Sequence, residues 1–140
     1  MRPLTALLFI CFPVFLFSQS IYGTWKLEQS ITYPDFMSPP QTLLKIQNEK
    51  DSVWALTYEW SPGNKTDSIV TALSGTFKDD LLTLHEEGIV TNKRQSPIII
   101  GTYKLKLYRG KRSLKFVGKY YPDKEYPSAS VTNITFIKEP

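Results

Sequence analysis

Side chains capable of catalysis are few in this 140-residue sequence, and they form no recognisable catalytic motif. His85 is the only histidine, so no histidine cluster is available to hold a metal ion. The acidic pairs Asp79–Asp80 and Glu86–Glu87 are adjacent in sequence, so each pair points to opposite sides of an extended chain and does not converge on a substrate. We therefore assign these acids to turns and expect no enzyme activity, no metal site and no cofactor.

Aromatic residues are the best candidates for a binding site. Those that we place on the inward faces of predicted strands are Trp54, Tyr58, Trp60, Tyr103, Phe116 and Tyr120. Tyrosine hydroxyls and indole N–H groups in an apolar wall are the few oriented polar groups that a small-molecule pocket uses. Plain core packing would produce the same set of inward aromatic residues. The sequence therefore leaves two alternatives open, a ligand pocket and a packed core.

The elements that must position these side chains are predicted to be strands. Eight segments show the alternation or composition of strands, namely 21–28, 42–47, 52–60, 68–77, 81–85, 97–108, 113–121 and 131–138. No helical period of useful length occurs, the segment 86–96 is polar enough to be a loop, and mostly short turns join the strands. The sequence therefore predicts an all-β fold, an eight-stranded antiparallel up-and-down β-barrel whose interior holds side chains or one small ligand.

Residues 1–20 are predicted to be a secretory signal peptide. Arg2 precedes an apolar run from Leu4 to Phe17, which is shorter than the roughly 20 residues that a spanning helix needs. Small residues follow, and we expect cleavage after Ser18 or Ser20. A single domain, 21–140, remains, and we expect a secreted or periplasmic location.

The single cysteine, Cys11, lies inside this apolar run. The residue before it is Ile10, whereas a bacterial lipoprotein signal has a small residue there, so a lipid anchor is disfavoured. The mature domain then has neither a disulfide nor a free thiol.

Charge gives little support for a polyanionic or membrane partner. The chain has 17 Lys+Arg and 13 Asp+Glu, a net charge of +4, and its lysines alternate along strands as on a solvated face. We therefore expect no nucleic acid partner. Lysines in mid-strand are costly against lipid, and the predicted fifth strand is too short to cross a bilayer. We therefore expect a domain that does not span the membrane after cleavage. We also expect a monomer.

The segment Gly23-Thr24-Trp25, which opens the series of strands, resembles the G-x-W signature of the lipocalins and the wider calycin group, and more closely the start of small secreted bacterial lipocalin-like domains. The resemblance implies that Trp25 packs across the closed end of the barrel, with Gly23 beside it. It also implies a basic side chain from the last strand over the tryptophan, and Lys138 has the right phase. The second lipocalin signature, a T-D-Y-like turn, is absent.

Two functions are expected from these observations. The first is a secreted lipocalin-like protein that binds a small apolar or amphipathic molecule inside the barrel without a reaction. The alternative is a structural, inhibitory or protein-interaction module with a packed core, which acts through its outer surface and its loops, including Phe36, Met37 and the segment 86–96.

Overall fold

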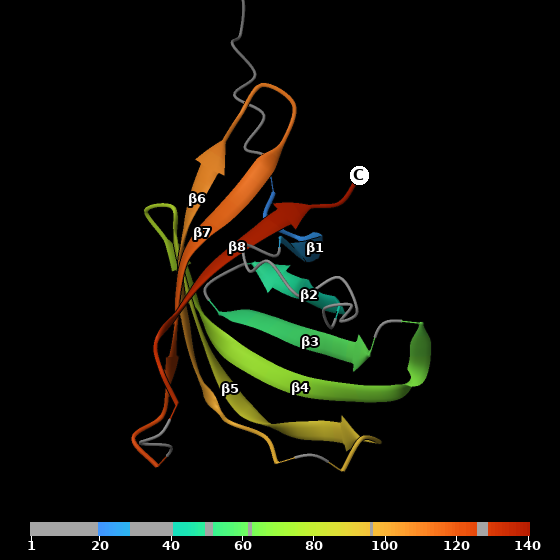
Figure 1. Cartoon of the computed structure of the whole chain (residues 1–140). Helices are drawn as coiled ribbons and strands as arrows, with labels where there is room; N and C mark the ends of the chain where they lie inside the picture. Colours follow the sequence, from blue (N-terminus) through green and yellow to red (C-terminus); the bar gives the residue numbers. More distant parts are fainter. Residues whose placement is uncertain (1–19, 29–40, 50–51, 62, 96, 126–128) are drawn as a thin grey trace, which may run out of the picture.

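The computed structural model describes residues 20–28, 41–49, 52–61, 63–95, 97–125 and 129–140 (Figure 1). Within these residues the chain forms eight strands and no helix. The strands are β1 (Gly23–Glu28), β2 (Gln41–Glu49), β3 (Val53–Ser61), β4 (Asn64–Lys78), β5 (Leu81–Asn92), β6 (Gly101–Arg109), β7 (Leu114–Pro122) and β8 (Thr132–Lys138). The predicted leader up to residue 19, and the segment 29–40 with Phe36 and Met37, lie outside the described residues.

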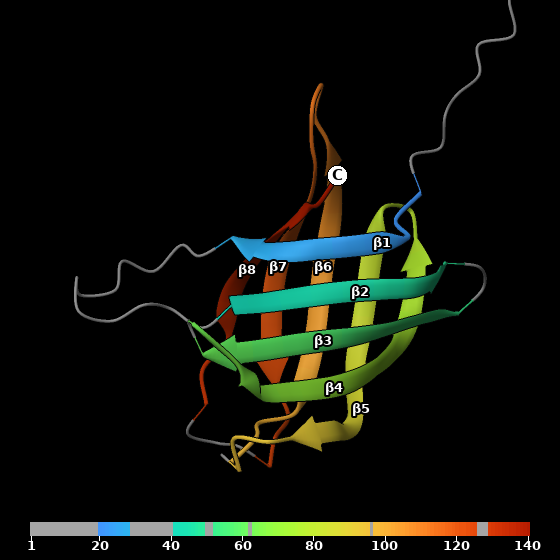
Figure 2. The same cartoon turned by 90° about the vertical axis from the view of Figure 1, so that its right-hand side faces the viewer.

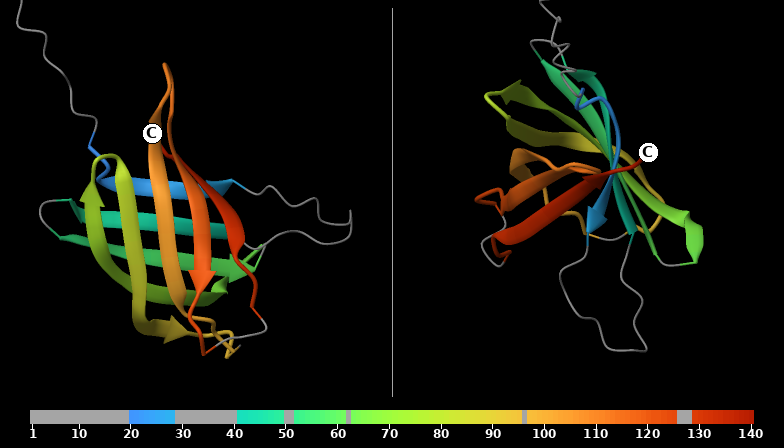
Figure 3. Two further views of the ribbon diagram at one scale, coloured as in Figure 1. Left: turned by 90° about the vertical axis from the view of Figure 1, so that its left-hand side faces the viewer. Right: turned by 90° about the horizontal axis from the view of Figure 1, so that it is seen from above.

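The strands pair in sequence order and close into a barrel. Every neighbouring pair is antiparallel, and β8 returns to pair with β1, so the predicted up-and-down barrel is confirmed. Strands β1 to β4 lie across strands β5 to β8, and the hairpin of β6 and β7 projects beyond the body (Figures 1, 2 and 3). Closure gives every strand two neighbouring strands, which is how antiparallel barrels limit edge-to-edge association.

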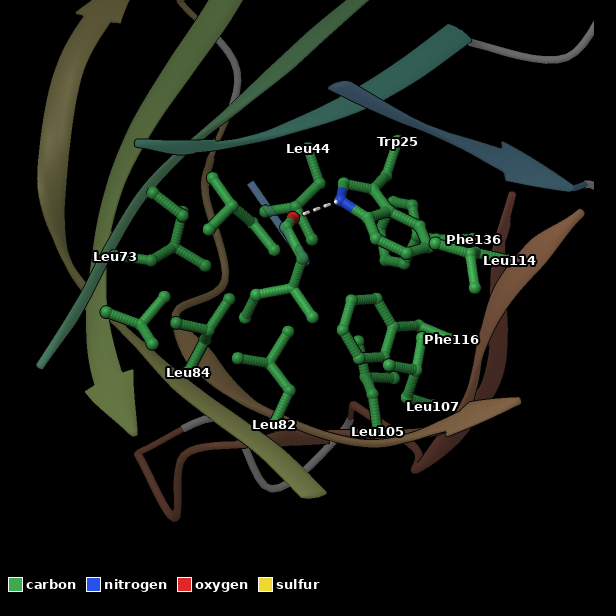
Figure 4. Packing of buried hydrophobic residues seen from close by; sticks show 14 residues of the cluster. Trp25, Leu44, Leu73, Leu82, Leu84, Leu105, Leu107, Leu114, Phe116 and Phe136 are labelled. Carbon is green, nitrogen blue, oxygen red and sulfur yellow. Dashed lines mark hydrogen bonds between the residues drawn. The ribbon is translucent and has the colours of Figure 1, made fainter. Parts of the chain in front are cut away.

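The core fills one end of the barrel with large apolar side chains (Figure 4). Trp25 is fully buried at its centre, and the centroid of its indole ring lies 4.4 Å from the centroid of the Phe116 ring. The indole N–H donates to the carbonyl oxygen of Ile21 at 2.9 Å, the dashed line in Figure 4. Leucines from β2, β4, β5 and β6, together with Phe136, surround these rings. Among the described residues, apolar side chains therefore fill this end of the barrel.

The first and last strands meet beside Trp25. Lys138 is the cross-strand partner of Trp25, and its ammonium group lies 5.7 Å from the centroid of the indole ring. The same ammonium group donates to the carbonyl oxygen of Ser20 at 2.6 Å. Gly23 has a φ of 127°, which disfavours a side chain, and a Cβ atom there would lie 3.4 Å from the Lys138 side chain. The three residues that the G-x-W resemblance singled out therefore form one structural unit at the seam, the junction where β1 pairs with β8.

Three predicted strand boundaries are wrong by four residues or more, and all concern the site. Strand β4 begins at Asn64 and not at Ser68. Strand β5 does not end at His85 but continues to Asn92, so 86–92 is strand and not loop. Strand β6 begins at Gly101 and not at Pro97. The extension of β5 was not predicted because residues 86–92 include several polar side chains, which are typical of a loop. They occur in a strand here because one end of the barrel interior is polar. With 12 residues β5 is not short, so the strand-length argument against a membrane barrel does not hold.

The predicted inward face of β3 is also wrong. Val53, Ala55 and Thr57 are buried inside the barrel, whereas Trp54 is 52% exposed on the outside. Tyr58 and Trp60 share the outward face with Trp54, where lysine ammonium groups lie over their rings. At the start of the strand the reason is volume, because Val53 and Ala55 belong to a core that larger side chains from other strands already fill.

Candidate functional site

The other end of the barrel is hollow. A cavity of about 520 Å³, here called the cup, opens to solvent there, and seven of the eight strands contribute to its wall. The lining residues are Thr42, Thr57, Glu59, Ile69, Thr71, Glu86, Arg94, Pro97, Ile98, Ile99, Tyr103, Tyr120, Pro122, Ala129, Ser130 and Thr132. This volume lies within the range of small-molecule pockets, and polar and charged residues outnumber apolar ones in its lining.

The carboxylate of Glu86 lies in the floor of the cup and is 6% exposed. The Tyr120 hydroxyl donates to it at 2.7 Å, and the Gly101 N–H donates at 3.0 Å. Alternation along β5 explains its position, because Leu82, Leu84 and Glu86 all point inward. Burial raises the pKa of Glu86 above its ordinary value, and the two hydrogen bonds oppose that rise only in part.

A pair of tyrosines completes the floor. The ring centroids of Tyr103 and Tyr120 lie 4.7 Å apart, on neighbouring strands where the two residues are cross-strand partners. Burial raises the pKa of Tyr103 well above its ordinary value, and the negative charge of Glu86 adds to this effect. The Tyr103 hydroxyl therefore stays protonated, and the Tyr120 hydroxyl donates to Glu86.

The absence of a side chain at Gly101 makes this arrangement possible. A Cβ atom at this position would lie 2.4 Å from the carbonyl oxygen of Tyr121 and 2.7 Å from the hydroxyl of Tyr120. Any larger residue would push Tyr120 away from Glu86. Gly101 therefore fixes the distance between the tyrosine hydroxyl and the buried carboxylate.

Arg94 lies at the rim of the cup and connects it to two strands. Its Nη1 donates to Oε1 of Glu59 at 2.8 Å, and its Nε lies 3.7 Å from Oδ2 of Asp67. Both Nε and Nη2 are buried and have no hydrogen-bond partner among the described residues. The guanidinium therefore keeps part of its hydrogen-bonding capacity for another group.

Asp67 is held in place by the hairpin between β3 and β4. The Ser61 hydroxyl donates to Oδ2 at 2.6 Å, and the Ser61 N–H donates to Oδ1 at 2.9 Å. These hydrogen bonds, with a smaller effect from the charge of Arg94, lower the pKa of Asp67. Asp67 is therefore an anion at neutral pH and keeps Arg94 directed along the rim.

The structure places the six predicted ligand-binding residues in three locations. Tyr103 and Tyr120 line the cup, and Phe116 lies in the packed core below it. Trp54, Tyr58 and Trp60 lie on the outside of β3, so they do not face the barrel interior as predicted.

Sequence analysis missed the charged residues of the cup. Glu86 was assigned to a turn, and Glu59 and Arg94 were given no role. The pattern Leu82, Leu84, Glu86 was the available signal, because strict alternation continues through the glutamate. Nothing in the sequence pairs Arg94 with Glu59, since these residues meet only because β3 and β5 both pair with β4.

The remaining candidate for chemistry, His85, lies on the outer face. Its Nε2 is 3.2 Å from Asp123 Oδ2, and its Nδ1 is 3.7 Å from Glu87 Oε1. The described part of the chain contains no group of three or more His, Cys, Asp or Glu residues that could hold a metal ion. It also contains no helix that is long and apolar enough to cross a membrane.

Comparisons with known proteins give no match, either to a family model, to a curated protein or to a solved structure.

Proposed function

We propose that this protein is an exported, lipocalin-like binding protein that holds one small amphipathic molecule in the cup without changing it. The observation that carries the proposal is the division of the barrel into a solid end and a hollow end. A barrel that served only as a scaffold would gain stability from filling its interior. This one keeps an open cavity with tyrosine, threonine and charged groups directed into it.

The proposal has three further parts. Export follows from the leader-like residues 1–20. Membership of the lipocalin-like group is supported by the contacts among Gly23, Trp25 and Lys138. The absence of catalysis is supported by the sequence, since the only histidine of the chain lies on the outside, away from the cup lining.

Native mass spectrometry of the mature protein tests ligand binding directly. We expect a bound mass in the native spectrum that disappears under denaturing conditions, and we expect Thr57→Phe, which places a ring in the cup, to abolish it. The matched control is Trp54→Ser on the outside of the same strand, which should retain the bound mass. Equal retention by both variants would show that the molecule binds elsewhere.

One observation supports the alternative function, a protein-interaction surface. The outward face of β3 presents Trp54, Tyr58 and Trp60 in one row, and Trp54 is 52% exposed. Exposed aromatic rows of this kind are common at interfaces. If Trp54→Ser abolished the biological activity of the protein while Thr57→Phe left it unchanged, this alternative would replace the first proposal.

A further inference from the structure

We infer that the ligand of the cup carries a protonated amine that pairs with Glu86, and a neutral oxygen acceptor that reaches Arg94. This inference rests on the proposed function and names the class of molecule that the cup would hold. It also narrows the small apolar or amphipathic ligand that the aromatic residues suggested.

Glu86 supplies the first argument, because it is a buried carboxylate without a nearby counter-ion among the described residues. The hydrogen bonds to its Oε2 come from neutral groups, the Tyr120 hydroxyl and the Gly101 N–H. The neighbouring His85 points to the outer face, where Asp123 and Glu87 hold it. A buried charge is costly unless an opposite charge accompanies it, and the open cup is the side from which such a charge can arrive.

Arg94, the single basic residue among the described residues of the cup lining, does not supply this charge. Its guanidinium lies between Glu59 at 2.8 Å and Asp67 at 3.7 Å, so its positive charge is already compensated. The lining as a whole therefore carries more negative than positive charge. An ammonium group is attracted into such a cavity, whereas a carboxylate or phosphate is repelled.

The tyrosine pair favours the same cation. The rings of Tyr103 and Tyr120 adjoin the Glu86 carboxylate at the floor, where their electron-rich faces can approach an ammonium group. Aromatic faces with one carboxylate are a common way to bind an organic amine, and the aromatic walls also contact its apolar part.

The rim defines the second group of the ligand. Nε and Nη2 of Arg94 are buried N–H donors without a hydrogen-bond partner among the described residues. The carboxylates of Glu59 and Asp67 beside them disfavour an anionic acceptor, so a hydroxyl or carbonyl oxygen is the better match. The cup therefore fits a small amino alcohol or amino amide with an apolar body.

Three compounds that share a phenyl ring test this inference: phenylalaninol, 3-phenylpropanol and 3-phenylpropionate. Each is titrated into ¹⁵N-labelled mature protein, and the Gly101 amide, which donates to Glu86, reports binding at the floor. Since a charge-assisted hydrogen bond contributes about 1.5–3 kcal/mol, we expect phenylalaninol to bind about tenfold or more tightly than 3-phenylpropanol. We expect 3-phenylpropionate to bind most weakly.

Glu86→Gln should remove the preference for the amine, and Glu87→Gln on the outer face is the matched control that should keep it. If 3-phenylpropanol or 3-phenylpropionate binds as tightly as phenylalaninol, the inference is overturned while the proposed function stands. If none of the three shifts the Gly101 amide, both fail. The ranking in the unaltered protein decides the question even where Glu86→Gln does not fold.

Discussion

Two adjacent glutamates show how strongly a residue's role depends on the face of the strand that it occupies. Glu86 is buried in the cup beneath a tyrosine hydroxyl, whereas Glu87 lies outside beside Ser74 and His85. The same side chain is thus a costly buried charge at one position and an ordinary solvated group at the next. Burial raises the pKa of Glu86.

Replacement of Glu86 by glutamine should make the protein more stable at neutral pH. Because the pKa of Glu86 is raised, the folded state binds its proton more tightly than the unfolded state does. Its contribution to stability is therefore fully present below about pH 4.5, the ordinary value, and is lost as the pH rises through the folded-state pKa. Each unit of pKa difference corresponds to about 1.4 kcal/mol.

Thermal unfolding of both proteins from pH 4 to pH 8 measures this effect. The melting temperature of Glu86→Gln should exceed that of the unaltered protein at pH 7, and the difference should shrink towards pH 4. Glu87→Gln provides the baseline. A difference that is independent of pH would mean that the carboxylate is not desolvated in the folded protein.

At the scale of the element, strand β3 places its small residues inside and its large aromatic residues outside. Replacement of Val53 by aspartate puts a charge into the packed core, and we expect a loss of about 3–5 kcal/mol in the free energy of unfolding. Trp54→Asp places the same charge on the outer face of the same strand and should cost far less. Urea denaturation of the two variants compares them directly, and the opposite ranking would show that β3 faces the other way.

The sequence was sufficient to predict the number of strands, their antiparallel order and the closed barrel, because turns and alternation are local signals. It was not sufficient to orient β3. Trp54, Leu56, Tyr58 and Trp60 form the more apolar face, yet at the start of the strand the core was already filled by Trp25 and its neighbours on other strands. That competition depends on contacts between distant segments, which alternation within one strand does not record.

The candidate site was predicted only in part for a related reason. Tyr103 and Tyr120 follow the expected aromatic pattern, whereas Glu86 and Arg94 broke the rule that inward residues are apolar. That rule applies to the solid end of the barrel and not to a cavity that water enters. Sequence analysis therefore described the packed half of the molecule better than the half that could bind a ligand.

At the scale of the whole molecule, the barrel depends on the seam between β1 and β8. Deletion of residues 131–140 should abolish the cooperative thermal transition, because it removes β8 from two neighbours and exposes the edges of β1 and β7. Light scattering should reveal self-association of the truncated protein. Deletion of Pro140 alone, beyond the last backbone hydrogen bond from Glu139 to Thr24, is the control and should melt as the full chain does. A normal transition without β8 would show that the sheet is stable when open.

The seam also determines the order of events when the chain is made. Strands β2 to β7 pair with neighbours that precede or follow them closely, so these hairpins can form while synthesis continues. Strand β1 can pair with β2 early, but its second neighbour, β8, is made last. The hydrogen bond from Lys138 to Ser20 joins residues 118 positions apart. Throughout that interval the indole of Trp25 lacks the strand that covers it. Burial of the Trp25 side chain can therefore report when the barrel is complete.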